Sequence, residues 1–197
     1  MDANPTTPLF DPENPNLYSD FTGQEALWNP VEELKLEQNG GETKLLDWDA
    51  TVKLNLLPLL AKDGHSIHSL STQLTFADQQ SDNFDYWFRP STSRLAMKND
   101  YKGEASRTYS KYRQHSLEWL GNYAMELKGH RARAMVGYSY QYFQNSGLNA
   151  ANKDFSSDGL LYNNLGSGEW AKEEGRNEMG TNKSDSKLIA FFGRLEL

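Results

Sequence analysis

The amino-acid sequence predicts an all-β fold, an antiparallel up-and-down meander that forms a partial wall of a large transmembrane β-barrel. Five segments alternate between apolar and polar residues, so each would form a strand with one apolar and one polar face. The connections between these segments alternate between short and long. Short turns on one side and long loops on the other are typical of outer-membrane barrels.

The first predicted strand, 44–57, carries the clearest alternation. Apolar residues lie two apart from Leu46 to Leu56, and every residue between them is polar. An alternating segment of about eleven residues is long enough to cross a bilayer at a tilt. A short polar turn at 61–65 leads into the second predicted strand, 67–77, whose apolar residues again share one face.

The later strands follow the same plan. A third strand is expected at 106–127 and a fourth at 131–143, with a tight turn at 128–130 between them. The fifth strand is expected to begin near Lys187 and to continue to the last residue of the sequence. The two long connections are expected at 78–105 and 146–183.

Aromatic residues recur at the long-loop end of four predicted strands. Each lies eight residues from the outward-facing residue nearest the short turn, and they are Trp48, Phe76, Trp119 and Tyr140. Eight residues span about 26 Å of strand, and a tilt near 40° reduces this length to a height of about 20 Å. This spacing favours an apolar band bordered by an aromatic girdle.

Composition and missing motifs narrow the function classes. The 197 residues carry a net charge of −7, which argues against nucleic-acid binding because such proteins present a basic face. The sequence has no cysteine, so a disulfide framework and a cysteine-ligated metal are excluded. Neither H-E-x-x-H nor G-x-S-x-G occurs, and we expect no enzyme, no cofactor and no metal site. The one helical candidate, 30–37, fits a short extended segment equally well.

Several segments resemble the mid-barrel region of SusC/RagA-type TonB-dependent outer-membrane transporters. The segment S-K-L-I-A-F-F-G-R at 186–194 resembles a barrel strand of that family with the form S-x-L-x-S-x-F-G-R. Residues 134–141 and 161–168 are similar to that region as well, and Asn29-Pro30 resembles the family's Asn-Pro at a loop-to-strand entry. The resemblance extends from about residue 29 to residue 194.

This resemblance implies a transporter in the cell outer membrane that imports oligosaccharides or peptides. Its partners would be a SusD-type surface lipoprotein, outer-membrane lipid, and TonB acting through a plug domain that we do not expect in this sequence. Barrels of that size have about 22 strands, so we expect the chain to be a fragment of the barrel. Residues 1–43 would be an extracellular loop region and strand entry, and 44–197 the five strands with their loops.

The alternative is a soluble β-rich module that binds glycans. Such a sandwich packs the apolar faces of two sheets against each other, and five strands leave few for a second sheet. In a membrane wall the same apolar faces would meet lipid.

The candidate binding residues are aromatic side chains of the two long loops. They are Phe84, Tyr86, Trp87, Phe88, Tyr162 and Trp170. Exposed aromatic rings stack on sugar rings, although large aromatic side chains also pack loops together. A second group would face the lumen, where we expect contact with the plug more than with substrate. Its members are Asp47, Asp49, Lys53, Glu118 and Glu126.

Overall fold

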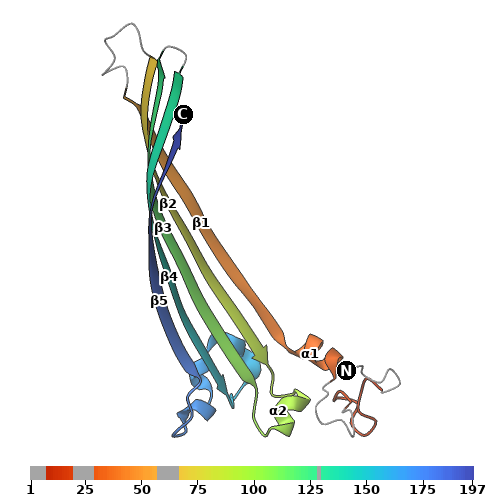
Figure 1. The fold of residues 1–197 in the computed structure, drawn as a ribbon. Helices are drawn as coiled ribbons and strands as arrows, with labels where there is room; N and C mark the ends of the chain where they lie inside the picture. Colours follow the sequence, from red (N-terminus) through yellow and green to blue (C-terminus); the bar gives the residue numbers. More distant parts are fainter. Residues whose placement is uncertain (1–7, 20–28, 57–66, 128–129) are drawn as a thin grey trace. The chain divides into compact units, whose positions relative to one another are not determined.

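The computed structural model describes residues 8–19, 29–56, 67–127 and 130–197. Its strands form one five-stranded antiparallel sheet in sequence order (Figure 1), which confirms the predicted meander. The strands are β1 (Gln38–Asn55), β2 (Ile67–Arg89), β3 (Glu104–Leu127), β4 (His130–Lys153) and β5 (Met179–Glu196). The predicted turn at 61–65, and residues 128–129 of the other turn, lie outside the described residues.

The register between β1 and β2 is constant along both strands. The backbone nitrogen of Leu56 donates a hydrogen bond to the oxygen of Leu70 (2.8 Å), and the hydroxyls of Thr51 and Thr75 lie 3.0 Å apart. Further along, Glu37 pairs with Arg89. In these three pairs the residue number on β1 falls by as much as the number on β2 rises. No bulge therefore interrupts the pairing, and alternate residues of each strand stay on the same face of the sheet.

Four of the five strands extend beyond a predicted end, whereas β3 matches its predicted range, 106–127, within two residues. β2 continues to Arg89 instead of stopping near residue 77, and β4 continues to Lys153 instead of residue 143. The long connections are correspondingly shorter than predicted and comprise 90–103 and 154–178. Polar pairs such as Lys111 with Asp82, whose charged atoms are 3.1 Å apart, continue the ladder where the apolar alternation ends.

The chain divides into two compact units, and every strand contributes residues to both. Unit 1 comprises Met1–Thr43, Asn83–Ser110 and Gly147–Asn182, and unit 2 comprises Lys44–Asp82, Lys111–Ser146 and Lys183–Leu197.

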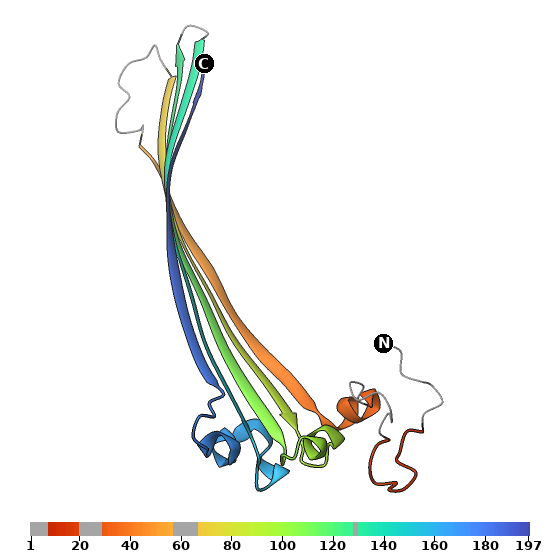
Figure 2. The same cartoon turned by 60° about the horizontal axis from the view of Figure 1, so that its bottom comes forward.

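Unit 1 contains the helical segments, which Figure 2 shows next to the strand ends that they connect. They are α1 (Pro30–Leu36), α2 (Arg94–Lys98), and the 3₁₀ turns η2 (Asp158–Asn163), η3 (Leu165–Ser167) and η4 (Trp170–Lys172). Within the described residues, no helix is long and apolar enough to cross a membrane.

Residues 30–36 form a helix, so the extended reading of this segment was wrong. The side chain of Asn29 caps it by accepting a hydrogen bond from the Val31 nitrogen (3.1 Å), and Pro30 occupies the first helical position. The Asn29 amide also donates to the oxygen of Leu9 (3.2 Å). Asn29-Pro30 therefore starts a helix that precedes β1 and ties this helix to the segment before it.

A small hydrophobic core lies in unit 1. Phe88, Ala105 and Phe155 are buried against one another, and Leu161, Tyr162 and Leu165 pack on this cluster. The 3₁₀ turns after β4 thus cover the ends of β2 and β3.

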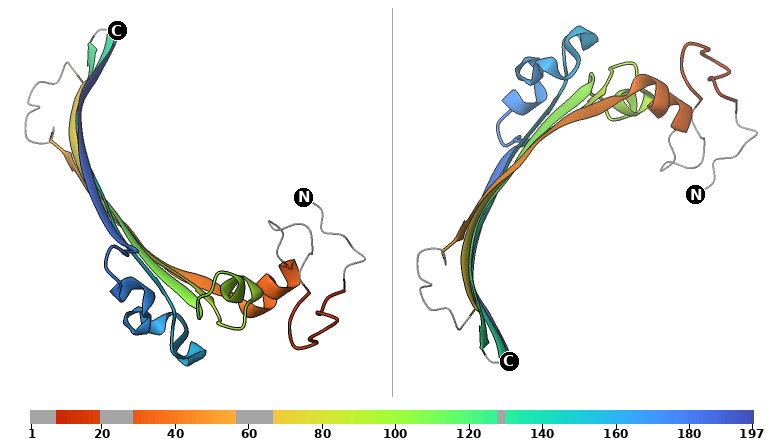
Figure 3. Two further views of the ribbon diagram at one scale, coloured as in Figure 1. Left: turned by 90° about the horizontal axis from the view of Figure 1, so that it is seen from below. Right: turned by 90° about the horizontal axis from the view of Figure 1, so that it is seen from above.

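Unit 2 consists of strand segments in one layer, visible in both views of Figure 3. Many of its large hydrophobic side chains are exposed, for example Val52 at 58% and Phe191 at 80%. Cross-strand contacts place many of them on one face: the rings of Trp48 and Phe76 are 5.4 Å apart, and those of Tyr138 and Phe191 are 5.2 Å apart.

Candidate functional site

Five charged side chains of alternating sign form a row in unit 1, which we call the charge row. They lie at, or next to, the strand ends that carry the long connections: Glu37, Arg89, Glu104, Lys153 and Glu178. The Arg89 guanidinium lies 2.6 Å from the Glu37 carboxylate and 3.5 Å from that of Glu104. The Lys153 ammonium lies 3.2 Å from Glu104 and 3.7 Å from Glu178. One continuous ion-pair chain therefore links all five strands.

The neighbours in the charge row favour its charged form. Burial alone would lower the pKa of Arg89, but the hydrogen bonds to Glu37 and Tyr101 and the charge of Glu37 together outweigh burial, and the pKa is raised. Burial likewise opposes the charge on Lys153, but the charges of Glu104 and Glu178 and the hydrogen bond to Glu104 together outweigh burial, so that this pKa is also raised. Burial raises the pKa of Tyr101, whose hydroxyl lies 3.0 Å from the Glu104 carboxylate.

Two of the predicted binding residues, Trp87 and Trp170, belong to the surroundings of the charge row. The Trp87 indole donates a hydrogen bond to Glu37 (2.9 Å), and the Arg89 guanidinium lies over its ring at 4.7 Å. The Lys153 ammonium lies 5.4 Å from the centre of the Trp170 ring, and Arg176 lies 5.1 Å from it. Both rings thus make cation–π contacts that hold the charged side chains in place.

Phe84, Tyr86 and Tyr162 come together with Tyr109 in what we call the aromatic group. The rings of Tyr86 and Tyr162 stack at 3.8 Å with an angle of 16° between their planes, and Phe84 lies 5.9 Å from Tyr109. Arg107 covers the Phe84 ring at 4.8 Å. Tyr109 remains 51% exposed, so the group offers an aromatic surface with a guanidinium beside it.

The candidate binding residues between positions 84 and 88 were expected in a long loop. They lie on β2 instead, because this strand extends to Arg89. Successive side chains of a strand point to opposite faces, which separates Tyr86 from Trp87. Phe88 is 2% exposed within the hydrophobic core, so its ring has packing contacts and no open face.

The residues expected to face the lumen lie in unit 2. Asp47, Asp49 and Lys53 alternate with Trp48 along β1 and are exposed, as is Glu118 on β3. Glu126 on β3 pairs with Arg131 on β4 at 3.3 Å. Within the described ranges, no group of three histidine, aspartate or glutamate side chains is arranged to hold a metal ion.

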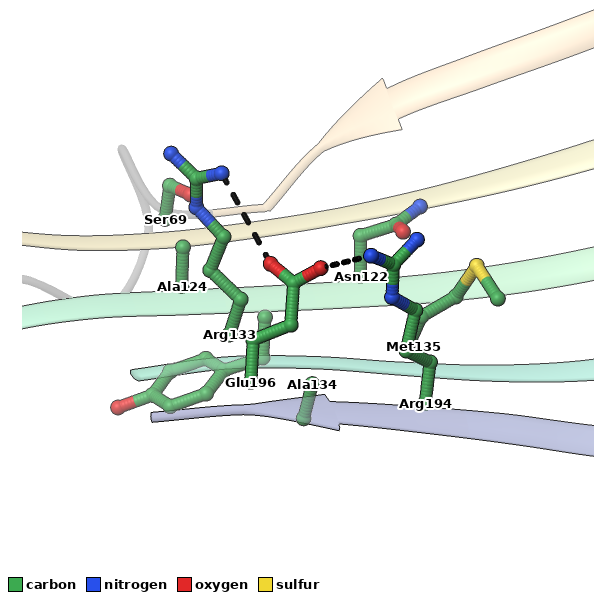
Figure 4. A pocket seen from close by; sticks show the side chains of 9 residues that line it. Ser69, Asn122, Ala124, Arg133, Ala134, Met135, Arg194 and Glu196 are labelled. Atoms are coloured by element: carbon green, nitrogen blue, oxygen red, sulfur yellow. Dashed lines mark ion pairs between the residues drawn. The ribbon is translucent and has the colours of Figure 1, made fainter. Parts of the chain in front are cut away.

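A shallow hollow of about 220 Å³ lies in unit 2 among side chains that include Ser69, Asn122, Arg133, Arg194 and Glu196. Figure 4 shows the Glu196 carboxylate between the two guanidinium groups. Arg133 lies 3.9 Å from it, and Arg194 pairs with its other oxygen. The arginine side chains remain largely exposed, so the hollow carries an excess of positive charge.

Sequence reasoning missed the charge row, Tyr109 and Arg107. The members of the charge row are far apart in the sequence, and only the strand register brings them together. Two signals could have found them: each lies at the boundary of a strand, and their charges alternate in sign along the chain. Tyr109 and Arg107 lie within the predicted third strand, and their contact with Phe84 appears only because β2 extends to Arg89.

The fold of this chain matches part of the RagA barrel in solved structures of the RagAB peptide importer. The match to its 'open-open' state has a TM-score of 0.60 at 14% identity and covers 91% of this chain and 18% of that chain. A structure titled as the RagAB peptide transporter gives a TM-score of 0.57 at 15% identity, with the same coverage. The 'closed-closed' state gives 0.57 at 14% identity and covers 82% of this chain and 16% of that chain.

This chain therefore spans less than a fifth of the length of the chains it matches, with 16% to 18% covered. No protein-family model and no curated protein matches the sequence. At these identities, the comparisons show the fold and leave the activity to be inferred from the residues.

Proposed function

We propose that this chain is a wall segment of a TonB-dependent outer-membrane transporter of the SusC/RagA type. Such a transporter would import peptides or oligosaccharides together with a SusD-type surface lipoprotein and would be energised by TonB through a plug. Residues 1–43 would belong to the extracellular region. The chain would supply structure and contacts to this assembly and would catalyse no reaction.

The uncovered apolar face of unit 2 carries this proposal. All buried hydrophobic side chains among the described residues belong to unit 1, whereas residues such as Val52, Leu54 and Ile189 in unit 2 are more than half exposed. An apolar surface of this extent requires another apolar phase, either lipid or a second protein layer. Since β1 and β5 are both open edges, further strands would have to pair with them in a bilayer.

The glycan-binding sandwich is the weaker alternative. A sandwich needs a second sheet to cover the first, and all five strands of the described residues belong to one sheet. The fold likeness to an outer-membrane importer also favours lipid as the partner of the apolar face.

The long connections would face the outside of the cell, because outer-membrane barrels place their longer loops there. The aromatic group, with Arg107, would then contact peptide, sugar or the surface lipoprotein. Tyr109 is its most suitable member for such contact, because its ring is both exposed and paired with Phe84. Peptide is the favoured cargo, since the structures that share the fold are those of a peptide importer or transporter.

Substitution of Tyr109 by alanine in the complete transporter tests this role. Uptake, or affinity for the lipoprotein, should fall by roughly tenfold, the weight of an exposed aromatic anchor at an interface. Phe10→Ala is the matched control, because Phe10 is an exposed aromatic residue of unit 1 outside the group. Unchanged uptake in Tyr109→Ala, at an unchanged level in the outer membrane, would contradict the proposed role of the group.

A further inference from the structure

A row of polar side chains crosses unit 2 on β2, β3, β4 and β5, and we call it the polar row. The Asp78 carboxylate lies 2.5 Å from His115 Nδ1. The rings of His115 and Tyr142 are parallel within 3° at 6.1 Å, and the Lys187 ammonium lies 5.9 Å from the centre of the Tyr142 ring. Four neighbouring strands therefore contribute one polar side chain each.

The polar row lies on the same face as the apolar side chains. Phe76 precedes Asp78 by two residues on β2, and Tyr138 precedes Tyr142 by four residues on β4. Residues separated by an even number of positions share a face of a strand. On β5, Phe191 follows Lys187 by four residues and contacts Tyr138. The polar row thus forms one border of the band of apolar side chains on this face of unit 2, which we call the apolar band.

The side chains of the polar row differ in how much charge or hydrogen-bonding capacity they leave available to a ligand. Asp78 is 5% exposed and also accepts a hydrogen bond from Gln80 (2.9 Å), so its charge is enclosed by partners. The Tyr142 hydroxyl accepts a hydrogen bond from Gln144 (3.0 Å), which leaves its own proton available for donation. Lys187 is exposed, with its ammonium beside that ring. An outside ligand would meet a cation and a hydroxyl donor.

We propose that the polar row lies at the level of the lipid headgroups and that Lys187 and the Tyr142 hydroxyl bind the phosphate of an anionic lipid. This inference rests on the proposed function, because it requires the apolar band to be in a bilayer. A basic side chain at the border of an apolar face can keep its stem along the acyl chains while its ammonium reaches the phosphate. At the other end of the row, the Asp78 carboxylate is buried and held by His115.

Lipid-selective quenching tests the inference on the complete transporter, free of other cysteines, in vesicles. This part of the sequence has no cysteine, so Ile189→Cys places a single bimane label two residues from Lys187 on the same face. Quenching by brominated phosphatidylglycerol is compared with quenching by brominated phosphatidylcholine. The anionic lipid should be preferred about fivefold, the weight of one basic side chain at an anionic surface.

Three variants show whether Lys187 is the source of this preference. Lys187→Gln should abolish the preference and Lys187→Arg should retain it, with strand content checked by circular dichroism. Lys53→Gln removes an equal charge on the opposite face of β1 and should leave the preference unchanged. Equal quenching by both lipids in the unsubstituted protein, or an equal loss in Lys53→Gln, would overturn the inference. Absence of quenching by either lipid would instead contradict the membrane-wall function.

Discussion

Units 1 and 2 share the same five strands and differ in how their side chains are stabilised. Unit 1 has a hydrophobic core around Phe88 and Phe155, and the charge row ties its strand ends together. In unit 2 the described hydrophobic side chains lie on the surface, and the one buried charged residue is Asp78. This difference agrees with the proposal that unit 1 faces water and unit 2 faces an apolar surrounding.

Truncation of a hydrophobic side chain should show the largest difference in stability between the two units. Phe88→Ala should lower the free energy of unfolding by about 4 kcal/mol, because it removes a buried ring and leaves a cavity. Phe191→Ala should change stability in detergent by less than about 1 kcal/mol, because this ring is 80% exposed. Denaturant unfolding of the chain in detergent micelles measures both. Equal losses in the two variants would mean that unit 2 has a core of its own.

Interruption of the charge row should have the next largest effect. Lys153→Met leaves Glu104 and Glu178 without the cation that they share. The free energy of unfolding of unit 1 should fall by about 2 kcal/mol. This loss is smaller than for a fully buried ion pair, because these side chains keep some contact with solvent. Lys172→Met removes an exposed pair with Glu169 and should cost under about 0.5 kcal/mol. If Lys153→Met loses no more stability than this control, the charge row does not stabilise unit 1.

A smaller effect is expected at alkaline pH and only in unit 1. The pKa values of Tyr101 and Lys153 are both raised in the folded chain. Burial is the largest cause for Tyr101, whereas burial opposes the charge of Lys153 and is outweighed by Glu104 and Glu178 together. A raised pKa stabilises the fold below the unfolded value and loses this contribution as the pH rises through the folded value. The unfolding midpoint should therefore fall as the pH rises beyond about 10.

The Lys153→Met variant is the internal control for this pH dependence, since it lacks one of the two groups. Its midpoint should fall less steeply than that of the unsubstituted chain over the same pH range. Identical slopes for the two proteins, followed by circular dichroism, would show that these groups are not responsible.

The sequence predicted the number and order of the strands because Leu46–Leu56 and its counterparts alternate with the period of a half-apolar sheet. It predicted the bounds of β3 within two residues but not the ends of β2 and β4, since pairing continues through polar residues such as Asp82, which carry no apolar signal. Helix α2 (Arg94–Lys98) is too short to show helical periodicity.

The candidate site was predictable only in part. The aromatic residues could be identified by type, but the side of the sheet that each one faces depends on register. Trp87 and Tyr86 are adjacent in sequence, yet the first contacts the charge row and the second stacks on Tyr162. The charge row itself could not be assembled without the pairing of all five strands.

The central claim is that the apolar face of unit 2 meets lipid, and single-cysteine labelling along β5 tests it most directly. Each residue from 188 to 195 is replaced in turn by cysteine and labelled with bimane in the complete transporter, free of other cysteines, reconstituted in phosphatidylcholine vesicles. Brominated lipid should quench labels at 189, 191 and 195 at least about threefold more than labels at 188, 190 and 192, because alternate residues face opposite sides. Quenching without a two-residue period, or an emission pattern unchanged when lipid is replaced by buffer, would contradict the claim.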